Sequence, residues 1–225
     1  MNKIPFSVYD FFGYLAAGAL VLAALDFSSG SGWLLKDSIS VVFGVFWTMT
    51  AYITGHIVAH ISSVLLEKKF LRGTLGSPEE IFFKEKKTGG WARLFPGHYA
   101  PFPKETQDRV LRKAKEKAGI ESPGRALFYH CHPIVFRQQV AQGRLNAFLN
   151  LYGFCRNVSM ASLLAILILL SGFLFIDRPH APDCSLVLWS VIGAFVTAVG
   201  MFYRYLKFFR HYTEEVFRTY AETDG

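Results

Sequence analysis

The chain is organised by long apolar runs separated by one long polar stretch. The clearest run, residues 159–176, reads SMASLLAILILLSGFLFI and contains no charged residue. It is close to the ~20 helical residues that cross the hydrocarbon core of a bilayer. Similar runs occupy residues 11–27, where Asp26 is the one charge, 38–66 and 185–203. The pattern therefore predicts a mainly α-helical, polytopic membrane protein with four transmembrane helices.

The polar stretch between the second and third spans predicts a mostly helical insert, residues 67–157. Its helices are indicated by the Ser77–Pro78 start signal and by the amphipathic pattern of residues 104–118. We expect the chain to have four parts: a leader and transmembrane hairpin (1–66), a basic cytoplasmic domain (67–157), a second hairpin (158–203) and an amphipathic tail helix (204–225).

The distribution of charge predicts the orientation of these parts. The formal net charge is +7, and residues 67–157 hold 17 of the 24 Lys and Arg but only 8 of the 17 Asp and Glu. Of the Lys and Arg residues, the two expected outer loops carry only Lys36 and Arg178. Because Lys and Arg accumulate in cytoplasmic loops, both termini and the insert are predicted to be cytoplasmic, in a bacterial inner membrane. We expect anionic head groups of the bilayer, rather than nucleic acid, to meet the basic residues.

Small residues recur at steps of three and four on two of the expected spans. On the second span they are Gly44, Thr48, Ala51, Gly55, Ala59 and Ser62, and on the fourth Ser190, Gly193, Thr197 and Gly200. On the first span, small residues give a similar smooth face, namely Gly13, Ala16, Ala17 and Gly18. Such ridges let helix backbones approach closely, so they predict helix packing and a homo-oligomer.

A polar stripe follows the second span, and its members are Thr48, Tyr52, His56, His60, Ser63 and Glu67. Because lipid cannot form hydrogen bonds, we expect this stripe to face other helices or water. His56 and His60 lie one helical turn apart, which leaves three interpretations open: interhelical hydrogen bonds, a pore-facing pair, or a metal site that would need a third ligand.

The remaining candidate residues lie in the insert and at the ends of the spans. Arg156 and Arg204 are expected to anchor the inner ends of spans three and four, with Arg156 as an alternative gate. Arg109, Arg112, Lys113, Lys115 and Lys117 could bind head groups or a soluble partner. His98, His130, Cys131 and His132 are a minor metal candidate, with an ordinary packed segment as the preferred interpretation. We expect no cofactor.

These features suggest an oligomeric membrane effector or pore-type subunit that is controlled by its cytoplasmic domain, with a phage-defence or toxin-like role. One alternative is an integral membrane enzyme that acts on lipid or quinone-like substrates through His56 and His60. Their spacing resembles one histidine box of membrane lipid hydroxylases and desaturases, but those enzymes use several boxes. The second alternative is a membrane scaffold that docks a soluble cytoplasmic protein.

Overall fold

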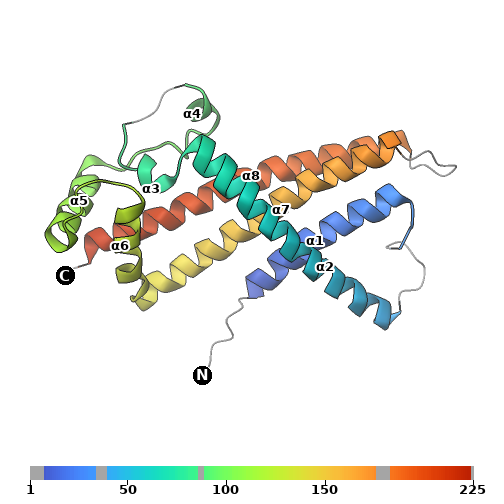
Figure 1. Ribbon diagram of the computed structural model, residues 1–225, viewed down its shortest axis with the longest axis horizontal. Helices are drawn as coiled ribbons and strands as arrows, with labels where there is room; N and C mark the ends of the chain where they lie inside the picture. Colours follow the sequence, from blue (N-terminus) through green and yellow to red (C-terminus); the bar gives the residue numbers. More distant parts are fainter. Residues whose placement is uncertain (1–7, 34–39, 86–88, 176–182, 224–225) are drawn as a thin grey trace. The chain divides into compact units, whose positions relative to one another are not determined.

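The computed structural model describes residues 8–33, 40–85, 89–175 and 183–223. These residues are mainly helical and include no strand (Figure 1). Some expected features lie outside the described residues: most of the leader, the start of the second span at residue 38 and the end of the third at residue 176.

The helices are as follows in chain order: α1 (Val8–Ser29), α2 (Val41–Ser62), η1 (Ser63–Leu75), α3 (Pro78–Ile81), α4 (Trp91–Leu94), α5 (Lys104–Ala118), α6 (Arg125–Phe136), α7 (Gln139–Phe175) and α8 (Cys184–Glu222). Four regions are long and apolar enough to cross a membrane, namely Phe11–Ser29, Val41–Ile81, Gln139–Leu174 and Cys184–Glu222. The prediction of a mainly helical chain with four candidate spans is therefore confirmed.

The second helical region continues beyond its expected end at Leu66. After Ser62 the backbone adopts the wider π-helical form, η1, which carries the chain past Glu67 to Leu75. The amide of Gly76 donates to the carbonyl of Leu71 at 2.8 Å, a π-type bond that closes the segment. The charges at residues 67–69 thus interrupt the apolar run without interrupting the helix.

The chain divides into two compact units. Unit 1 consists of Met1–Glu67 and Gly153–Tyr205, and unit 2 of Lys68–Tyr152 and Leu206–Gly225. Helices α7 and α8 contribute residues to both units. Unit 2 joins the insert to the tail, because Val216, Phe217 and Tyr220 of α8 are buried in one core with Val110 and Leu127 of the insert.

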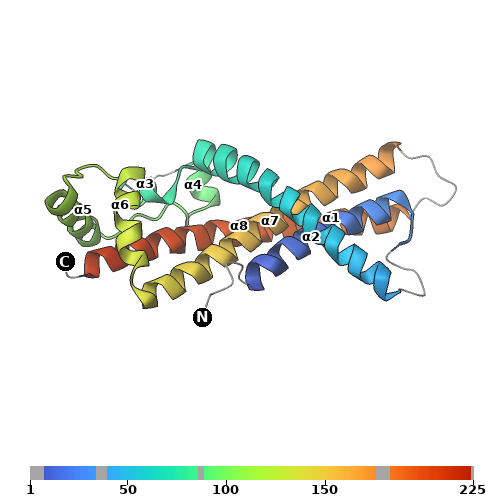
Figure 2. The same ribbon diagram turned by 60° about the horizontal axis from the view of Figure 1, so that its bottom comes forward.

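In unit 1, helices α1 and α2 cross at a contact between glycines (Figures 1 and 2). A Cβ atom placed on Gly18 would lie 1.7 Å from the carbonyl oxygen of Ala51. One placed on Gly55 would lie 1.9 Å from the carbonyl oxygen of Tyr14. Only glycine permits this approach, so the two backbones meet directly.

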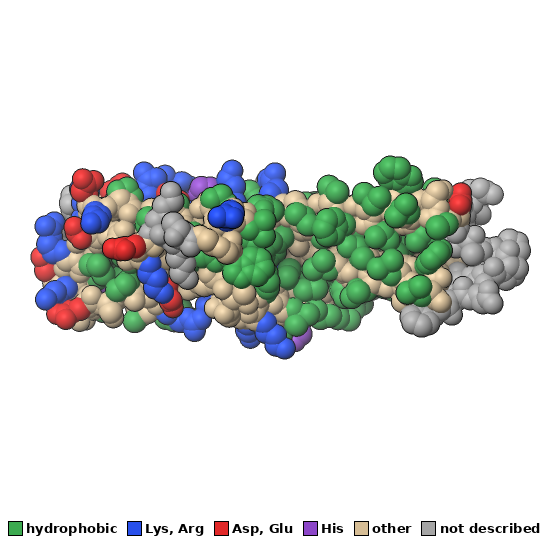
Figure 3. Space-filling view, turned by 90° about the horizontal axis from the view of Figure 1, so that it is seen from above, with side chains coloured by type: hydrophobic (Ala, Val, Ile, Leu, Met, Phe, Trp, Pro, Cys, Tyr) green, Lys and Arg blue, Asp and Glu red, His purple; other side chains and the backbone are tan. Residues whose placement is uncertain are grey.

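Unit 1 exposes large apolar side chains around most of its described surface. Examples are Phe46 on α2, Leu167 on α7 and Trp189 on α8, which are 65%, 64% and 69% exposed. Hydrophobic side chains cover this unit in Figure 3, whereas Lys, Arg, Asp and Glu side chains gather on unit 2.

Unit 2 has a conventional apolar core that is rich in aromatic rings. Phe82 stacks on Phe102 with their ring centroids 4.1 Å apart, and Phe217 meets both rings edge-on. The Arg210 guanidinium lies over the Phe82 ring, 4.4 Å from its centroid. This core fixes the end of α8 against the insert.

Candidate functional site

The polar stripe of α2 faces outward over most of its length. Thr48, His56 and His60 are exposed, while Tyr52 is half-buried. The Thr48 hydroxyl donates to the carbonyl of Gly44 at 2.9 Å, so its own helix satisfies its donor. The two histidines therefore supply the main hydrogen-bonding capacity on this outer face of a candidate span.

An aromatic cluster between α1 and α2 holds the His56 ring. This imidazole stacks on Tyr14, with the ring centroids 4.0 Å apart, and meets the edge of Tyr52 at 4.7 Å. Phe11 extends the cluster, 5.2 Å from Tyr52. The glycine crossing brings α1 and α2 together at this point. Because the rings of Tyr14 and Tyr52 both contact it, the His56 imidazole has a defined orientation on the surface.

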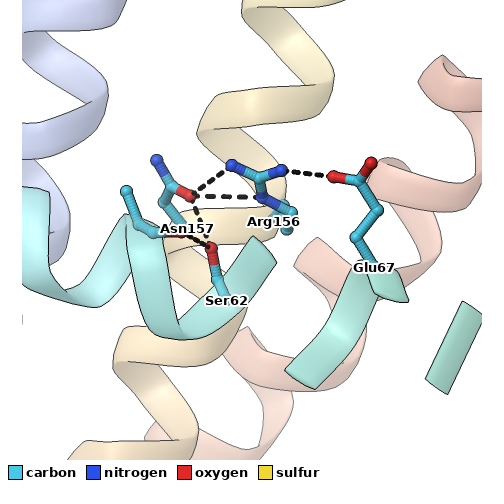
Figure 4. A network of polar contacts seen from close by, with 5 residues as sticks. Ser62, Glu67, Arg156 and Asn157 are labelled. Atoms are coloured by element: carbon cyan, nitrogen blue, oxygen red, sulfur yellow. Dashed lines mark hydrogen bonds and ion pairs between the residues drawn. The ribbon is translucent and has the colours of Figure 1, made fainter. Parts of the chain in front are cut away.

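The last turn of α2 and the start of η1 form a polar network with α7 (Figure 4). The Ser62 hydroxyl lies 2.8 Å from Asn157 Oδ1 and 2.9 Å from the Ala59 carbonyl oxygen. The Arg156 guanidinium contacts Glu67 Oε2 at 2.5 Å and lies 3.4 Å from Asn157 Oδ1. Four side chains from α2, η1 and α7 thus share one connected set of polar contacts.

The charged pair in this network is largely withdrawn from solvent. The side chains of Arg156 and Glu67 are only 13% and 15% exposed, and Ser62 and Asn157 are buried. Removing one partner of such a pair leaves the other charge buried without compensation, which is strongly destabilising. The network therefore locks Glu67, the last member of the polar stripe, to α7.

The other anchor candidate, Arg204, lies against the residue that precedes Arg156. Arg204 is exposed on α8 and hydrogen-bonds the buried Cys155 of α7. Ser63 is half-buried at the start of η1. The structure thus brings Arg156 together with Glu67 of the polar stripe and places Arg204 against Cys155.

The small-residue ridges have different surroundings on the two spans. Gly55 and Ala59 are buried on α2 at or near the crossing with α1. A Cβ atom on Gly44, Gly193 or Gly200 would meet nothing within 4 Å. Gly193 and Thr197 line a cavity among α1, α7 and α8.

The histidines of unit 2 make separate structural contacts. Residues 125–136 form helix α6, where His130 and His132 reach the hydroxyls of Tyr220 at 3.2 Å and Tyr212 at 2.8 Å. His98 Nε2 donates to the carbonyl oxygen of Gly76 at 3.1 Å. Across residues 8–33, 40–85, 89–175 and 183–223, no three His, Cys, Asp or Glu side chains gather as a metal site would require.

Burial also explains the chemistry of Cys131. This side chain is fully buried, and burial raises the pKa of its thiol to about 12, although nearby Lys113 acts in the opposite direction. A thiol with such a pKa stays protonated at neutral pH and is a poor nucleophile. Cys131 therefore serves as a small apolar core residue.

Most of the basic residues of α5 are exposed, and one has a structural role. Arg109, Arg112, Lys115 and Lys117 lie on the surface, with Lys115 paired to Glu121 at 2.9 Å. Lys113 instead donates to the carbonyl oxygens of Tyr220, at 2.7 Å, and Thr223. It satisfies the C-terminal carbonyls of α8 and so ties α5 to that helix end.

Sequence reasoning placed Gly18 and Ser62 on packing faces of the first and second spans, and the structure does bring Gly18 against α2. It did not place Ser62 or Asn157 in a polar network with Glu67 and Arg156.

Comparison of the chain with models of protein families, with curated proteins and with solved structures finds no match.

Proposed function

We propose that the protein is a subunit of an oligomeric, pore-type membrane effector in the bacterial inner membrane. In this proposal the four apolar helices span the bilayer, and both termini and unit 2 are cytoplasmic. The strong excess of Lys and Arg in residues 67–157 supports this orientation. The exposed apolar side chains of unit 1 support insertion into the bilayer, because transfer of apolar surface from water into lipid is favourable.

The observation that carries the proposal is a regular, exposed seam along α2. Its members are Val42, Phe46, Met49, Ile53, His56 and His60, which follow one another at steps of four, three, four, three and four residues. Every one of them is exposed. This spacing is the heptad pattern of helices that pack side by side in left-handed bundles. The seam is therefore suited to the same seam on further copies of the chain.

The two histidines explain why this seam needs a partner. An imidazole in the hydrocarbon region has no hydrogen-bonding solvent, so polar residues in spans usually face other helices or water. Within one copy His56 stacks on Tyr14 of α1, and both imidazoles are exposed. In a ring of copies they would face one another or a central aqueous path, and a polar residue at a seam position also fixes register.

Unit 2 would then provide control. The exposed basic residues Arg109, Arg112 and Lys117 offer a surface for a soluble partner or for anionic head groups. A membrane effector that is triggered through this surface fits a phage-defence or toxin-like role. A scaffold that only docks a partner would share the surface but would not need the histidine seam.

The decisive experiment measures membrane potential and viability after the protein is induced in bacterial cells. We expect the wild type to depolarise the membrane and the double variant His56→Ala/His60→Ala to lose this effect. The matched control is Val45→Ala/Ile57→Ala, which truncates two side chains outside the seam with 55% and 58% exposure on the same helix. The control should retain depolarisation, because it leaves both imidazoles in place.

Oligomerisation has its own test, disulfide cross-linking in native membranes. In a Cys184→Ser background, Met49→Cys on the seam should form dimers on oxidation, whereas Leu167→Cys on α7 should not. Both sites are exposed, at 60% and 64%. A strictly monomeric protein in membranes would contradict the proposal, and cross-linking without any depolarisation would leave an oligomeric scaffold.

A further inference from the structure

The short helix α4 of unit 2 lies beside the end of η1 (Figures 1 and 2). Trp91, the first residue of α4, meets the ring of Phe70 on η1 edge-on, with the ring centroids 5.8 Å apart. It also stacks on Phe95, with a centroid distance of 6.2 Å. Two rings therefore hold the indole in place, yet Trp91 remains 43% exposed.

The two segments that meet here, residues 68–78 and 89–103, combine exposed apolar and basic side chains. Besides Trp91, Leu94 is 52% exposed. The exposed basic side chains are Lys68, Lys69 and Arg93. Neither segment contains Asp or Glu before residue 79 or between residues 89 and 103. This combination suits the head-group layer of a membrane, where Trp is enriched and anionic lipids attract Lys and Arg.

The inner end of the third span shows where this layer begins on η1. No charged residue separates Arg156 from Asp177, and the 20 residues between them would rise about 30 Å as a helix, which is the thickness of the hydrocarbon core. Arg156 therefore marks one boundary of that core. Its ion pair with Glu67 places the first turn of η1 at the same boundary.

Phe70 lies just beyond this boundary. It follows Glu67 by three residues on the same helix, which is at most about 5 Å further along the axis. The head-group layer is about 5–7 Å thick on each side of the hydrocarbon core. Because Trp91 contacts Phe70, its indole lies at the level of the head groups when the span crosses a bilayer.

We propose that α4 and residues 68–70 of η1 form a binding site for the anionic head groups of the surrounding bilayer. Trp91 and Leu94 insert at the boundary between head groups and acyl chains, and Arg93 donates to lipid phosphate. The absence of acidic residues from both segments favours an anionic phospholipid over a zwitterionic one. This inference rests on the membrane-spanning arrangement of the proposed function, but not on a pore or on an oligomer.

The test is depth-dependent quenching of tryptophan fluorescence in the full chain, reconstituted into phospholipid vesicles. The chain has four Trp residues; one variant keeps Trp91 alone and a matched variant keeps Trp189 alone, with Phe at the other three positions. We expect a nitroxide on the lipid head group to quench Trp91 about twofold more strongly than a nitroxide midway along the acyl chain. Trp189, which is 69% exposed within the fourth candidate span, should show the reverse order.

The two variants distinguish a failure of this inference from a failure of the proposed function. If the acyl-chain nitroxide quenches Trp189 but neither label quenches Trp91, the head-group site is wrong and α4 is left for a soluble partner. Stronger quenching of Trp91 by the acyl-chain label would also overturn the site. If neither label quenches either residue, the chain does not span the bilayer and both proposals fall.

The preference for anionic lipid has its own test in vesicles that carry the head-group label. Adding phosphatidylglycerol to phosphatidylcholine should strengthen the quenching of Trp91, and Arg93→Glu should remove this increase. The matched control is Arg125→Glu, which makes the same change of charge at an exposed residue of α6 and should keep the increase. Quenching that does not depend on phosphatidylglycerol, or an equal loss in both variants, would overturn the assignment of an anionic lipid.

Discussion

The two units of this protein place polar and apolar side chains in opposite ways. Unit 1 exposes residues such as Ile53 and Trp189 and buries Ser62 and Asn157 in a hydrogen-bonded network. Unit 2 fully buries residues such as Phe217 and exposes most of its described Lys and Arg side chains. Since α7 and α8 contribute to both units, the same helices change pattern along their length. The surroundings of each segment, rather than its secondary structure, decide which residues it buries.

This contrast implies that an ion pair contributes differently to the free energy of unfolding in the two units. Unit 1 holds its ion pair, Arg156–Glu67, almost out of solvent, while unit 2 has the exposed pair Lys84–Glu80, whose side chains are 56% and 50% accessible. Exposed pairs contribute about 0–1 kcal/mol, whereas breaking a buried pair costs about 3–5 kcal/mol. Comparing the two pairs is therefore a direct test of the contrast.

The largest effect is expected for Arg156→Met. This change removes the largely buried ion pair with Glu67 and the Arg156 contacts to Asn157, and should lower the free energy of unfolding by about 3–5 kcal/mol. The measurement is reversible unfolding in mixed detergent micelles, followed by circular dichroism.

Two further variants sharpen this prediction. Adding Glu67→Gln to Arg156→Met should recover much of the loss, because it also removes the buried carboxylate charge. Lys84→Met in unit 2 should change stability by less than about 1 kcal/mol. Equal losses for Arg156→Met and Lys84→Met would mean that the ion pair in unit 1 is solvated after all.

The sequence predicted the helices of unit 1 well because long uncharged runs have few alternative structures. The run 159–176 needs no knowledge of its neighbours to be read as a helix of membrane length. By pattern alone, residues 126–132 fit either a strand or a helix, since a short apolar segment is compatible with both. In the structure this segment is helical, and its His132 and His130 contact Tyr212 and Tyr220, which lie 80 and 90 residues further along the chain.

The candidate site was less predictable. The spacing of residues shows which face of a helix a side chain occupies, but not which residues of other helices contact it. Glu67 and Arg156 were both singled out, yet nothing in their positions 89 residues apart indicates that they pair. Similarly, the ridges on spans two and four have the same spacing. Only the structure shows that Gly55 meets a helix whereas Gly193 lines a cavity.

The glycine crossing of unit 1 gives the second prediction. Gly55→Ala should destabilise the protein by about 3 kcal/mol, the upper range for overpacking, because the new Cβ would overlap the Tyr14 backbone. Gly44→Ala on the same helix has open space at that position and should be neutral or slightly stabilising. Both are measured by the same micelle unfolding assay, and similar stabilities for the two variants would show that α1 and α2 do not meet at Gly55.

The third prediction concerns unit 2, which buries a neutral titratable group where unit 1 buries a charged pair. Burial lowers the pKa of His98 to about 4, against the partial opposition of its bond to Gly76, and Arg210 lowers it further. Acid therefore protonates the unfolded state first, near pH 6.5, and stability is lost as the pH falls from about 6.5 towards 4. Between pH 7.5 and pH 5 the loss attributable to His98 should be about 2 kcal/mol.

The variant His98→Gln isolates this contribution from that of other titrating groups. The Gln amide can still donate to the Gly76 carbonyl but does not titrate, so the free energy of unfolding should fall less steeply between pH 7.5 and pH 5 than in the wild type. The relevant quantity is the difference between the two slopes, since carboxylates and the remaining histidines contribute to both. Parallel curves would show that His98 is hydrated or already protonated in the folded state. If the two losses differ by about 2 kcal/mol, unit 2 keeps the buried His98 neutral, whereas unit 1 buries the charged pair Arg156–Glu67.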